Sequence, residues 1–451
     1  MREPRPQGRT TLGGKLSAVL VAAGSSVGLG NIWRFPYVAG NNGGGAFLLV
    51  YLLCVLLLGL PILMAEFSLG RATRRNAVGA CRALAPGWSF LGYNSVLTAF
   101  LILGFYFVVA GWTAEYTVHS LTGELARCTT AQEYRSFFEA FIRNPWRPVV
   151  YTAAFILLTH GIIVLGVQKG IERSAQVLMP LLFLILVVLA VHSLCMPGSG
   201  AGLEFLFRPD FAKLTPRPVL VALGQAFFSL SLGMGIMVTY ASYFKPETDL
   251  RRTALHVILL DTLVAVLAGV VVFPAVFSVG IEPSSGPSLV FITLPGVFHG
   301  MPLSRIWSTV FFLLLVVAAL TSTISLHEVI TAYIQEERRT TRKAAARITT
   351  AATLVLAVAA SLSVGIGSRY TFLGRNGFEL LDDLTAHILL PIGGLLICLL
   401  VGWRLDRSIL RAQVTNEGTL RFRLYRLFVV LLRYFCPLVL VLIFLDNLGL
   451  F

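Results

Sequence analysis

The sequence GSSVGLGN, residues 24–31, interrupts an apolar stretch that begins at Leu16. It places three glycines and two serines within eight residues. Glycine loosens a helix, and inside a bilayer every backbone amide released from the helix needs another partner. Such a break is tolerated only where it is buried in protein or lines a polar site. The stretch therefore predicts a broken membrane-spanning helix at a binding site.

The rest of the chain is typical of a membrane protein. Of its 451 residues 56% are hydrophobic and 13% are charged, whereas a soluble domain carries about 25% charged residues. Apolar segments of about 20 residues, long enough to span a bilayer, recur along the whole chain. These segments predict an all-α integral membrane protein that forms a single domain over residues 1–451. We expect about eleven spans, at 15–37, 44–69, 89–121, 148–166, 174–195, 219–243, 252–280, 304–335, 345–364, 379–403 and 427–447.

The net charge of +14 is distributed unevenly between the two sides of the predicted membrane. With the N-terminus inside, the cytoplasmic connections and the N-terminal segment hold 24 Lys and Arg, and the outer connections hold 10. This bias follows the positive-inside rule and predicts a multi-pass protein of the cell (inner) membrane with a cytoplasmic N-terminus and an outer C-terminus. The charges then indicate membrane lipid as a partner, and no nucleic acid.

A second interruption occurs five spans after the first. Ser26-Val-Gly28-Leu-Gly30 in span 1 recurs as Ser231-Leu-Gly233-Met-Gly235 in span 6. Paired Gly-interrupted spans in two halves indicate a transporter built from inverted repeats, here 15–195 and 219–403 with an extra span at 427–447. The exposed amides suit a carboxylate and the exposed carbonyls suit a cation. The alternative is a pair of helix faces in which small residues allow close packing.

Longer stretches resemble a known family. GSSVGLGNIWRFPYVAGNNGGGAFLLVY (24–51), GQAFFSLSLGMGIMVTYASY (224–243) and LTSTIS (320–325) are similar to the neurotransmitter:sodium symporter family, in its bacterial amino-acid transporter branch. The resemblance covers spans 1 to 10. It implies a fold of five plus five inverted spans in which spans 1 and 6 are broken. It also implies sodium-driven uptake (symport) by alternating access, which is transport and not enzyme catalysis.

The resemblance implies two sodium sites made of oxygen ligands, which a hard cation prefers. The first would use Ser26, Asn31, Ser229 and Asp261 together with the substrate carboxylate. The second would use Gly24, Val27, Ala318, Thr321 and Ser322. Taken alone, the hydroxyls of LTST are equally typical of hydrogen bonds between helices.

The substrate site would lie between the two broken spans. Its carboxylate would meet the amides of Leu29 and Gly30 and the hydroxyl of Tyr106, and its amine would meet carbonyls near Ser26 and Ser229. The predicted substrate-binding residues are Ser25, Ser26, Leu29, Gly30, Ile102, Tyr106, Phe228, Ser229, Ser231, Met234, Ser322, Ser325 and Leu326.

Two positions refine the expected substrate and ions. Monoamine-carrying members have an aspartate where this chain has Gly28, so the substrate here would bring its own carboxylate, as an amino acid does. The mostly apolar pocket favours a hydrophobic or aromatic side chain.

Asp261 replaces the family's usual asparagine, next to the place where animal relatives bind chloride. Tyr51, Gln225 and Ser229 match that chloride surround, but Ala265 replaces its fourth ligand. We therefore expect chloride independence, with proton antiport as a further option and a purely structural acid as the alternative.

Charge pairs would close the site on each side. Arg34 with Asp382 would form the outer gate above Phe228, and Asp383 is the rival partner. Arg9 with Glu336, together with Tyr243, would form the inner gate.

Three further segments carry expectations. Glu66 would bond the free amides of broken span 6. Gly170 and Pro180 resemble a family element that unwinds at the start of span 5, and the alternative is a helix that begins near Pro180. Residues 283–300 predict a short helical hairpin over the outer surface.

Two other functions remain open at the level of sequence. A channel or a substrate-sensing receptor on the same scaffold is the alternative to a symporter. No HExxH or G-x-S-x-G motif is present, which argues against an enzyme. We expect a monomer or a weak dimer, and the sequence does not name the amino acid.

Overall fold

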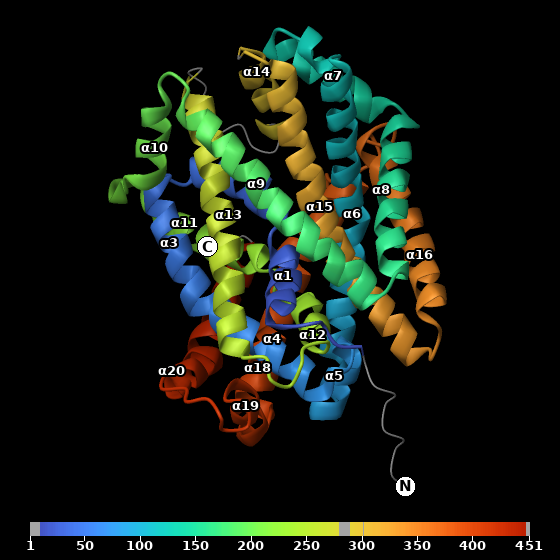
Figure 1. The fold of residues 1–451 in the computed structure, drawn as a ribbon, viewed down its shortest axis with the longest axis vertical. Coiled ribbons are helices and arrows are strands. Elements are labelled where there is room, and N and C mark those ends of the chain that lie inside the picture. Colours follow the sequence, from blue (N-terminus) through green and yellow to red (C-terminus); the bar gives the residue numbers. More distant parts are fainter. Residues whose placement is uncertain (1–9, 279–288, 301, 448–451) are drawn as a thin grey trace.

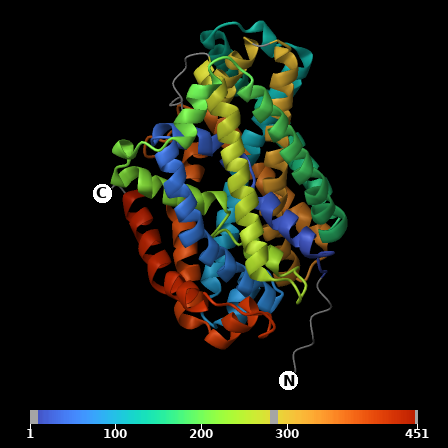
Figure 2. The same ribbon diagram turned by 60° about the vertical axis from the view of Figure 1, so that its left-hand side comes forward.

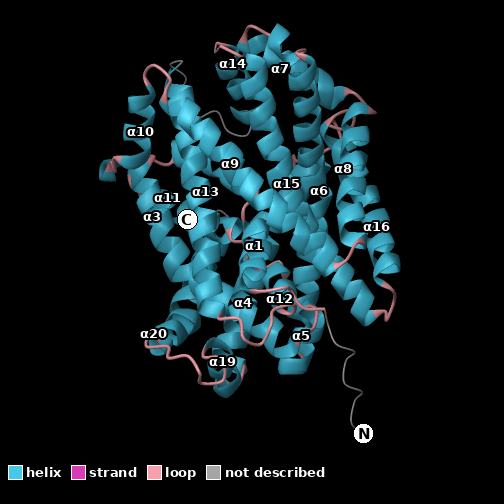
Figure 3. Cartoon of the chain, in the orientation of Figure 1, coloured by secondary structure: helices cyan, strands magenta, loops and turns pink. Residues whose placement is uncertain are grey.

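Apolar helices dominate the computed structural model, which describes residues 10–278, 289–300 and 302–447. Within these ranges no strand forms, and two isolated β-bridges, Gly44 with Pro209 and Phe372 with Arg375, are the only extended pairings. Figure 3 shows helices throughout, joined by short loops. The all-α expectation is therefore confirmed.

Nine continuous helices in the described ranges are long and apolar enough to cross a membrane. They are α3–α4 (Gly45–Thr73), α6 (Ser89–Thr122), α8 (Arg147–Val164), α9 with the turn before it (Val167–Leu194), α13 (Leu250–Ser278), α15 (Ser304–Glu337), α16 (Arg342–Val364), α17–α18 (Gly377–Arg404) and α20–α21 (Tyr425–Asn447). Because Pro180 lies inside the helix Val167–Leu194, the alternative of a helix that begins near Pro180 is wrong.

The two remaining spans are interrupted at the predicted places. Span 1 consists of α1 (Lys15–Ser26) and the helical segment Gly30–Asn41, which are bent by 52° at the break between them. Span 6 consists of α11 (Pro216–Ser229) and α12 (Ile236–Ala241), separated by residues 230–235. By length and composition, the nine continuous helices and the bent pair of span 1 give ten candidate spans within the described residues. The shorter helices α11 and α12 do not meet these criteria, and they take the place of the predicted sixth span.

The interrupted spans lie in the middle of the helical assembly. Figure 1 shows α1 next to α13 and below the crossing helix α9, with α12 beneath it, and α1 packs against all three. The helices α6 and α15, each 34 residues long, pack along one another beside them. Figure 2 shows the C-terminal α21 (Cys436–Asn447) on the flank, where it packs against α18 (Leu390–Leu399) and α11. The last span thus lies outside the central group.

Short helices cover the two ends of the molecule. At one end α7 (Ala131–Arg143) lies beside α14 (Leu294–His299), and at the other lie α5 (Ala77–Leu84) and α19 (Arg407–Val414) (Figure 1). The predicted hairpin at 283–300 is described only from Leu289, and the part before it lies outside the described residues. Phe291 stacks on Phe138 of α7 with a ring-centroid distance of 5.6 Å, so this segment covers the ends of α6 and α15.

Candidate substrate and sodium site

The two interruptions contact each other directly. The Ser231 hydroxyl donates to the Ser25 carbonyl at 3.1 Å, and the Ser26 hydroxyl donates to the Leu230 carbonyl at 3.4 Å. Backbone carbonyls released by one broken helix thus accept hydrogen bonds from side chains of the other. The predicted facing of spans 1 and 6 is confirmed.

A small cavity of about 30 Å³ lies between these breaks. Two of the predicted substrate residues, Leu29 and Ser325, do not line it. The Leu29 amide donates to the hydroxyl of Tyr106, which does line the cavity, and the Ser325 hydroxyl accepts a hydrogen bond from Tyr240 at 2.7 Å. The volume holds roughly one or two water molecules, so an organic ligand requires side chains to move outward. Eleven of the thirteen predicted substrate residues line the cavity: Ser25, Ser26, Gly30, Ile102, Tyr106, Phe228, Ser229, Ser231, Met234, Ser322 and Leu326.

The cavity wall at Gly28 has no room for a side chain. A Cβ atom there would lie 2.3 Å from the Ser322 hydroxyl oxygen and 3.0 Å from the Tyr106 hydroxyl oxygen. The Leu29 amide donates to the same Tyr106 hydroxyl at 3.2 Å. An amide and a phenol at the N-terminus of a half-helix are suitable partners for an anionic group. The protein supplies no acid at this point, so a bound amine would need another partner.

Asp261 lies at the centre of a buried oxygen cluster. The Asn31 amide donates to its carboxylate at 2.8 Å and to the Ser229 hydroxyl at 3.0 Å. Ser229 and Tyr51 also donate to the carboxylate, at 2.8 and 3.4 Å. Asp261 is fully buried, and these partners are neutral. A buried carboxylate surrounded by neutral oxygens is costly unless a cation joins it, so the ligand chemistry fits sodium.

The residues around Asp261 differ from the chloride-binding arrangement of animal relatives, because Gln225 makes its hydrogen bond elsewhere and Ala265 offers no side-chain oxygen. Gln225 turns its amide toward the Gly30 carbonyl at 3.3 Å, while Tyr51 and Ser229 face the carboxylate. Ala265 lies one turn along α13 and is fully buried. The negative charge at this place therefore belongs to the protein itself.

The second predicted sodium site gathers neutral oxygens. The Thr321 hydroxyl donates to the Val27 carbonyl at 3.2 Å and to the Ala318 carbonyl at 2.9 Å. Gly24 lies beside Thr321, while Ser322 faces Gly28 and the cavity. The structure thus brings together Gly24, Val27, Ala318 and Thr321, and it places the Ser322 hydroxyl on the substrate side.

Glu66 supports the break in span 6. Its carboxylate accepts the Gly233 amide at 2.8 Å, and the side chain is fully buried. The expectation that Glu66 bonds a free amide of this break is confirmed. Gly233 and Gly235 have φ of 80° and 75°, a region that side chains with a Cβ rarely adopt, and Ser231 has φ of 54°.

The predicted outer gate is arranged differently from the expectation. The Arg34 guanidinium lies over the Phe228 ring, 4.5 Å from its centroid. Within the described residues no ion pair joins Arg34 to Asp382, although the two charges are near enough to interact. Asp383 pairs instead with Arg375 and with His387. The cavity is therefore covered on this side by an aromatic ring beneath a cation.

The predicted inner gate is only partly described. Arg9 lies outside the described residues, and the Glu336 carboxylate accepts the Asn76 amide at 2.8 Å. The Tyr243 hydroxyl donates to Glu328 at 2.6 Å, and Arg342 makes a two-pronged ion pair with the same carboxylate. Tyr243 is thus part of a buried charged network.

Sequence reasoning missed Glu328, Arg342 and Ile236. A glutamate inside the apolar span 304–335 was a signal for the first, because an acid in a span requires a partner. Arg342 carried no signal of its own because it stands among five basic residues at 338–347. Ile236 lines the cavity next to Met234, but an apolar residue in an apolar helix is not distinguishable by sequence alone.

This arrangement of spans, paired breaks and buried oxygens defines a multi-pass transporter with a central ion and ligand site. The chain matches the model of the "Sodium:neurotransmitter symporter family" over residues 9–146 and 142–451. It therefore belongs to that family.

Individual relatives that are named as transporters, and a solved structure, are also similar to this chain. An uncharacterized sodium-dependent transporter of Bacillus subtilis (strain 168), YhdH, is 39% identical over 437 residues, which are 96% of this chain and 97% of that protein. A sodium-dependent serotonin transporter of Drosophila melanogaster is 31% identical over 73% of this chain and 60% of its own. The crystal structure of MhsT in complex with L-phenylalanine matches 98% of this chain and 100% of its own, with a TM-score of 0.89 and 43% identity.

These findings establish a sodium-dependent membrane transporter with the inverted-repeat fold expected from the sequence. The family consists of symporters and not of enzymes.

Proposed function

We propose that the protein takes up an amino acid with a hydrophobic or aromatic side chain, driven by two sodium ions and without chloride, through alternating access. The observation that carries the proposal is that no side chain, and therefore no acid, fits at Gly28. Where no acid fits, the substrate must supply the carboxylate that completes the sodium cluster at Asp261. The Leu29 amide and the Tyr106 hydroxyl form the complementary place for that carboxylate.

The cavity lining supports the apolar preference. Ile102, Met234, Ile236 and Leu326 supply its apolar surface, and a methionine side chain adapts to rings and branched chains alike. MhsT, which shares 43% of its aligned residues with this chain, has been solved with L-phenylalanine. The relatives are named as transporters, which gives the receptor and channel alternatives no support.

Coupling follows from shared ligands. If the substrate carboxylate completes the site of Asn31, Ser229 and Asp261, sodium and substrate each raise the affinity for the other. The Thr321 site takes the second ion next to the hinge of span 1. The excess of Lys and Arg on one side favours an inner-membrane protein with a cytoplasmic N-terminus, an outer C-terminus and surrounding lipid.

A binding panel tests this function. Radiolabelled amino acids are offered to the purified protein in sodium, potassium, chloride and gluconate media. We expect sodium-dependent binding that is strongest for large apolar side chains and unchanged by chloride. Binding that ignores sodium, or a preference for amines without a carboxylate, would refute the proposal.

Asp261→Asn tests the ion assignment. Removing the buried charge is expected to lower sodium affinity by about tenfold or more in chloride-free medium, because a close charge pair is lost. Chloride should restore part of the loss, since the site again needs an anion. Glu139→Gln, which removes an exposed carboxylate in α7, is the control. Chloride stimulation of the unaltered protein would contradict the assignment.

A further inference from the structure

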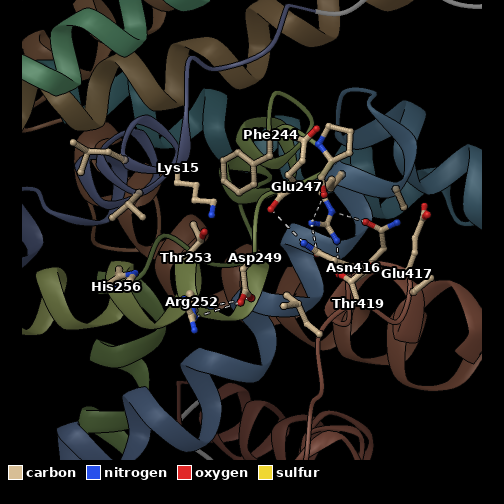
Figure 4. Close-up of a pocket in the computed structure, with 18 of the residues that line it drawn as sticks. Lys15, Phe244, Glu247, Asp249, Arg252, Thr253, His256, Asn416, Glu417 and Thr419 are labelled. Carbon is tan, nitrogen blue, oxygen red and sulfur yellow. Dashed lines mark hydrogen bonds and ion pairs between the residues drawn. The ribbon is translucent and has the colours of Figure 1, made fainter.

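A cavity of about 1170 Å³ opens where α1 and α13 begin, and it shares no lining residue with the substrate cavity. Its other walls come from the end of α4 and from α19 with the loop after it (Figure 4). This volume exceeds the roughly 300–1,000 Å³ of an ordinary small-molecule pocket. It leaves room for a headgroup and the first part of an acyl chain.

One wall of the cavity is apolar and faces outward from the helices. Leu16 of α1 is 69% exposed and Leu259 of α13 is 63% exposed, and Val19 and Leu260 lie beside them. All four belong to membrane-spanning segments, so this wall continues the surface that lipid tails cover. A water-soluble ligand has no use for such a wall.

The polar lining carries charges of both signs. Lys15 in the first turn of α1 is exposed, and within the described residues it makes no hydrogen bond or ion pair. Arg252 in the first turn of α13 has an 82% exposed side chain and reaches Asp249 at 3.7 Å. Glu247, Asp249 and Glu417 add three carboxylates. Figure 4 shows Lys15, Thr253 and Asp249 around one part of the cavity, with Arg252 beside Asp249.

Arg71 is a buried basic residue of the lining. It is 8% exposed, and its guanidinium is bonded to the Thr248 carbonyl at 2.5 Å and to the Asn416 side chain at 2.9 Å. Asp249 is shared by Arg251 and Arg252. Arg74 also lines the cavity and already has an interaction of its own. We therefore assign Lys15 and Arg252 as the cations that meet a ligand, and the exposed Glu247 lies on the same cavity.

We propose that this cavity binds a glycerophospholipid whose headgroup carries both a phosphate and a primary ammonium, the chemistry of phosphatidylethanolamine. The phosphate lies between Lys15 and Arg252, the ammonium faces the carboxylates of Glu247 and Asp249, and an acyl chain covers Leu16 and Leu259. A glycerol headgroup brings no cation to the exposed Glu247 carboxylate. A choline headgroup has no N–H to donate to them.

The location gives such a lipid a role in transport. Lys15 begins the half-helix α1, and Arg252 belongs to α13, against which α1 packs. A headgroup that joins the two residues holds α1 on α13. A ligand that fits only this arrangement increases its population.

Native mass spectrometry of the full chain tests the site. The protein is offered phosphatidylethanolamine, phosphatidylglycerol and phosphatidylcholine of identical chains at equal mole fractions. We expect one phosphatidylethanolamine to be retained in preference to the others. The double variant Lys15→Ala/Arg252→Ala should lose at least about tenfold in that retention, as expected when charge-assisted bonds are removed. Lys343→Ala, an exposed lysine in the first turn of α16, should retain the lipid.

A second variant removes no charge, and its melting temperature shows whether a loss of lipid comes from the filled cavity or from unfolding. Ala72→Trp fills the cavity from α4, and it should reduce lipid retention while the melting temperature stays near that of the unaltered protein. Equal or stronger retention of phosphatidylglycerol by the unaltered protein would overturn the proposal, as would full retention in both variants. These measurements use neither sodium nor an amino acid, so their failure would leave the proposed transport untouched.

Discussion

The two interrupted spans carry the same Ser-x-Gly-x-Gly pattern for different physical reasons. In span 1, Gly28 is required by space, because a Cβ atom would collide with the Ser322 hydroxyl at 2.3 Å. No residue from Val27 to Gly30 has a positive φ. In span 6, Gly233 and Gly235 are required by the backbone, with φ of 80° and 75°. One break is shaped by what faces it and the other by its own chain conformation.

This difference assigns separate tasks to the breaks. In the proposed function the span 1 break presents amides and carbonyls to ligands, and Gly28 leaves free the space that a side chain would occupy. The span 6 break is held open by Glu66, whose carboxylate accepts the Gly233 amide at 2.8 Å. Substitutions in span 1 should therefore change binding first, and substitutions in span 6 should change stability first.

Gly28→Ala is expected to have the largest effect. The added methyl group displaces Ser322 and crowds Tyr106, and overpacking of about 1–3 kcal/mol corresponds to a loss of roughly 5- to 150-fold in substrate affinity. Equilibrium binding of the labelled amino acid measures it. Gly161→Ala in α8, where a Cβ atom meets nothing within 4 Å, is the control. Partial rescue by an added Ser322→Ala change would confirm that space is the cause, and unchanged affinity in Gly28→Ala would break the comparison.

Gly233→Ala is expected to act mainly on stability. The residue would have to keep a left-handed conformation and place its Cβ 2.9 Å from the Leu390 carbonyl, at a cost of about 1–3 kcal/mol. Thermal unfolding in detergent should show a drop of several degrees. Gly200→Ala in α10 (Ser199–Phe207) has open space and serves as its control. A normal melting temperature with lost binding would reverse the roles assigned to the two breaks.

Ser231→Gly is expected to have the smallest effect. Glycine relieves the positive φ of 54°, which favours folding, while the hydrogen bond to the Ser25 carbonyl is lost. These contributions are of similar size, about 1 kcal/mol each, so the melting temperature should change little. Substrate affinity should fall only a few fold. A large loss of either quantity would show that the bond between the breaks matters more than the backbone strain.

The spans and both breaks could be predicted because hydropathy and the spacing of Gly and Ser are local properties of the chain. The oxygen cluster of Asn31, Ser229 and Asp261 came from resemblance to a family and not from any periodicity. The outer gate was harder, because Arg34 has several possible partners and the sequence does not say that it covers the Phe228 ring. The ion pair of Glu328 with Arg342 depends on how two helices meet, which no local pattern encodes.

The division of span 1 into two pieces also means that neither piece crosses the whole membrane by itself. The 12 residues of α1 extend about 18 Å, roughly half of the hydrocarbon thickness. Because the chain bends by 52° at the break, α1 and the segment Gly30–Asn41 follow separate axes and do not form one rigid rod. In the alternating access proposed above, each half of span 1 closes one side of the site.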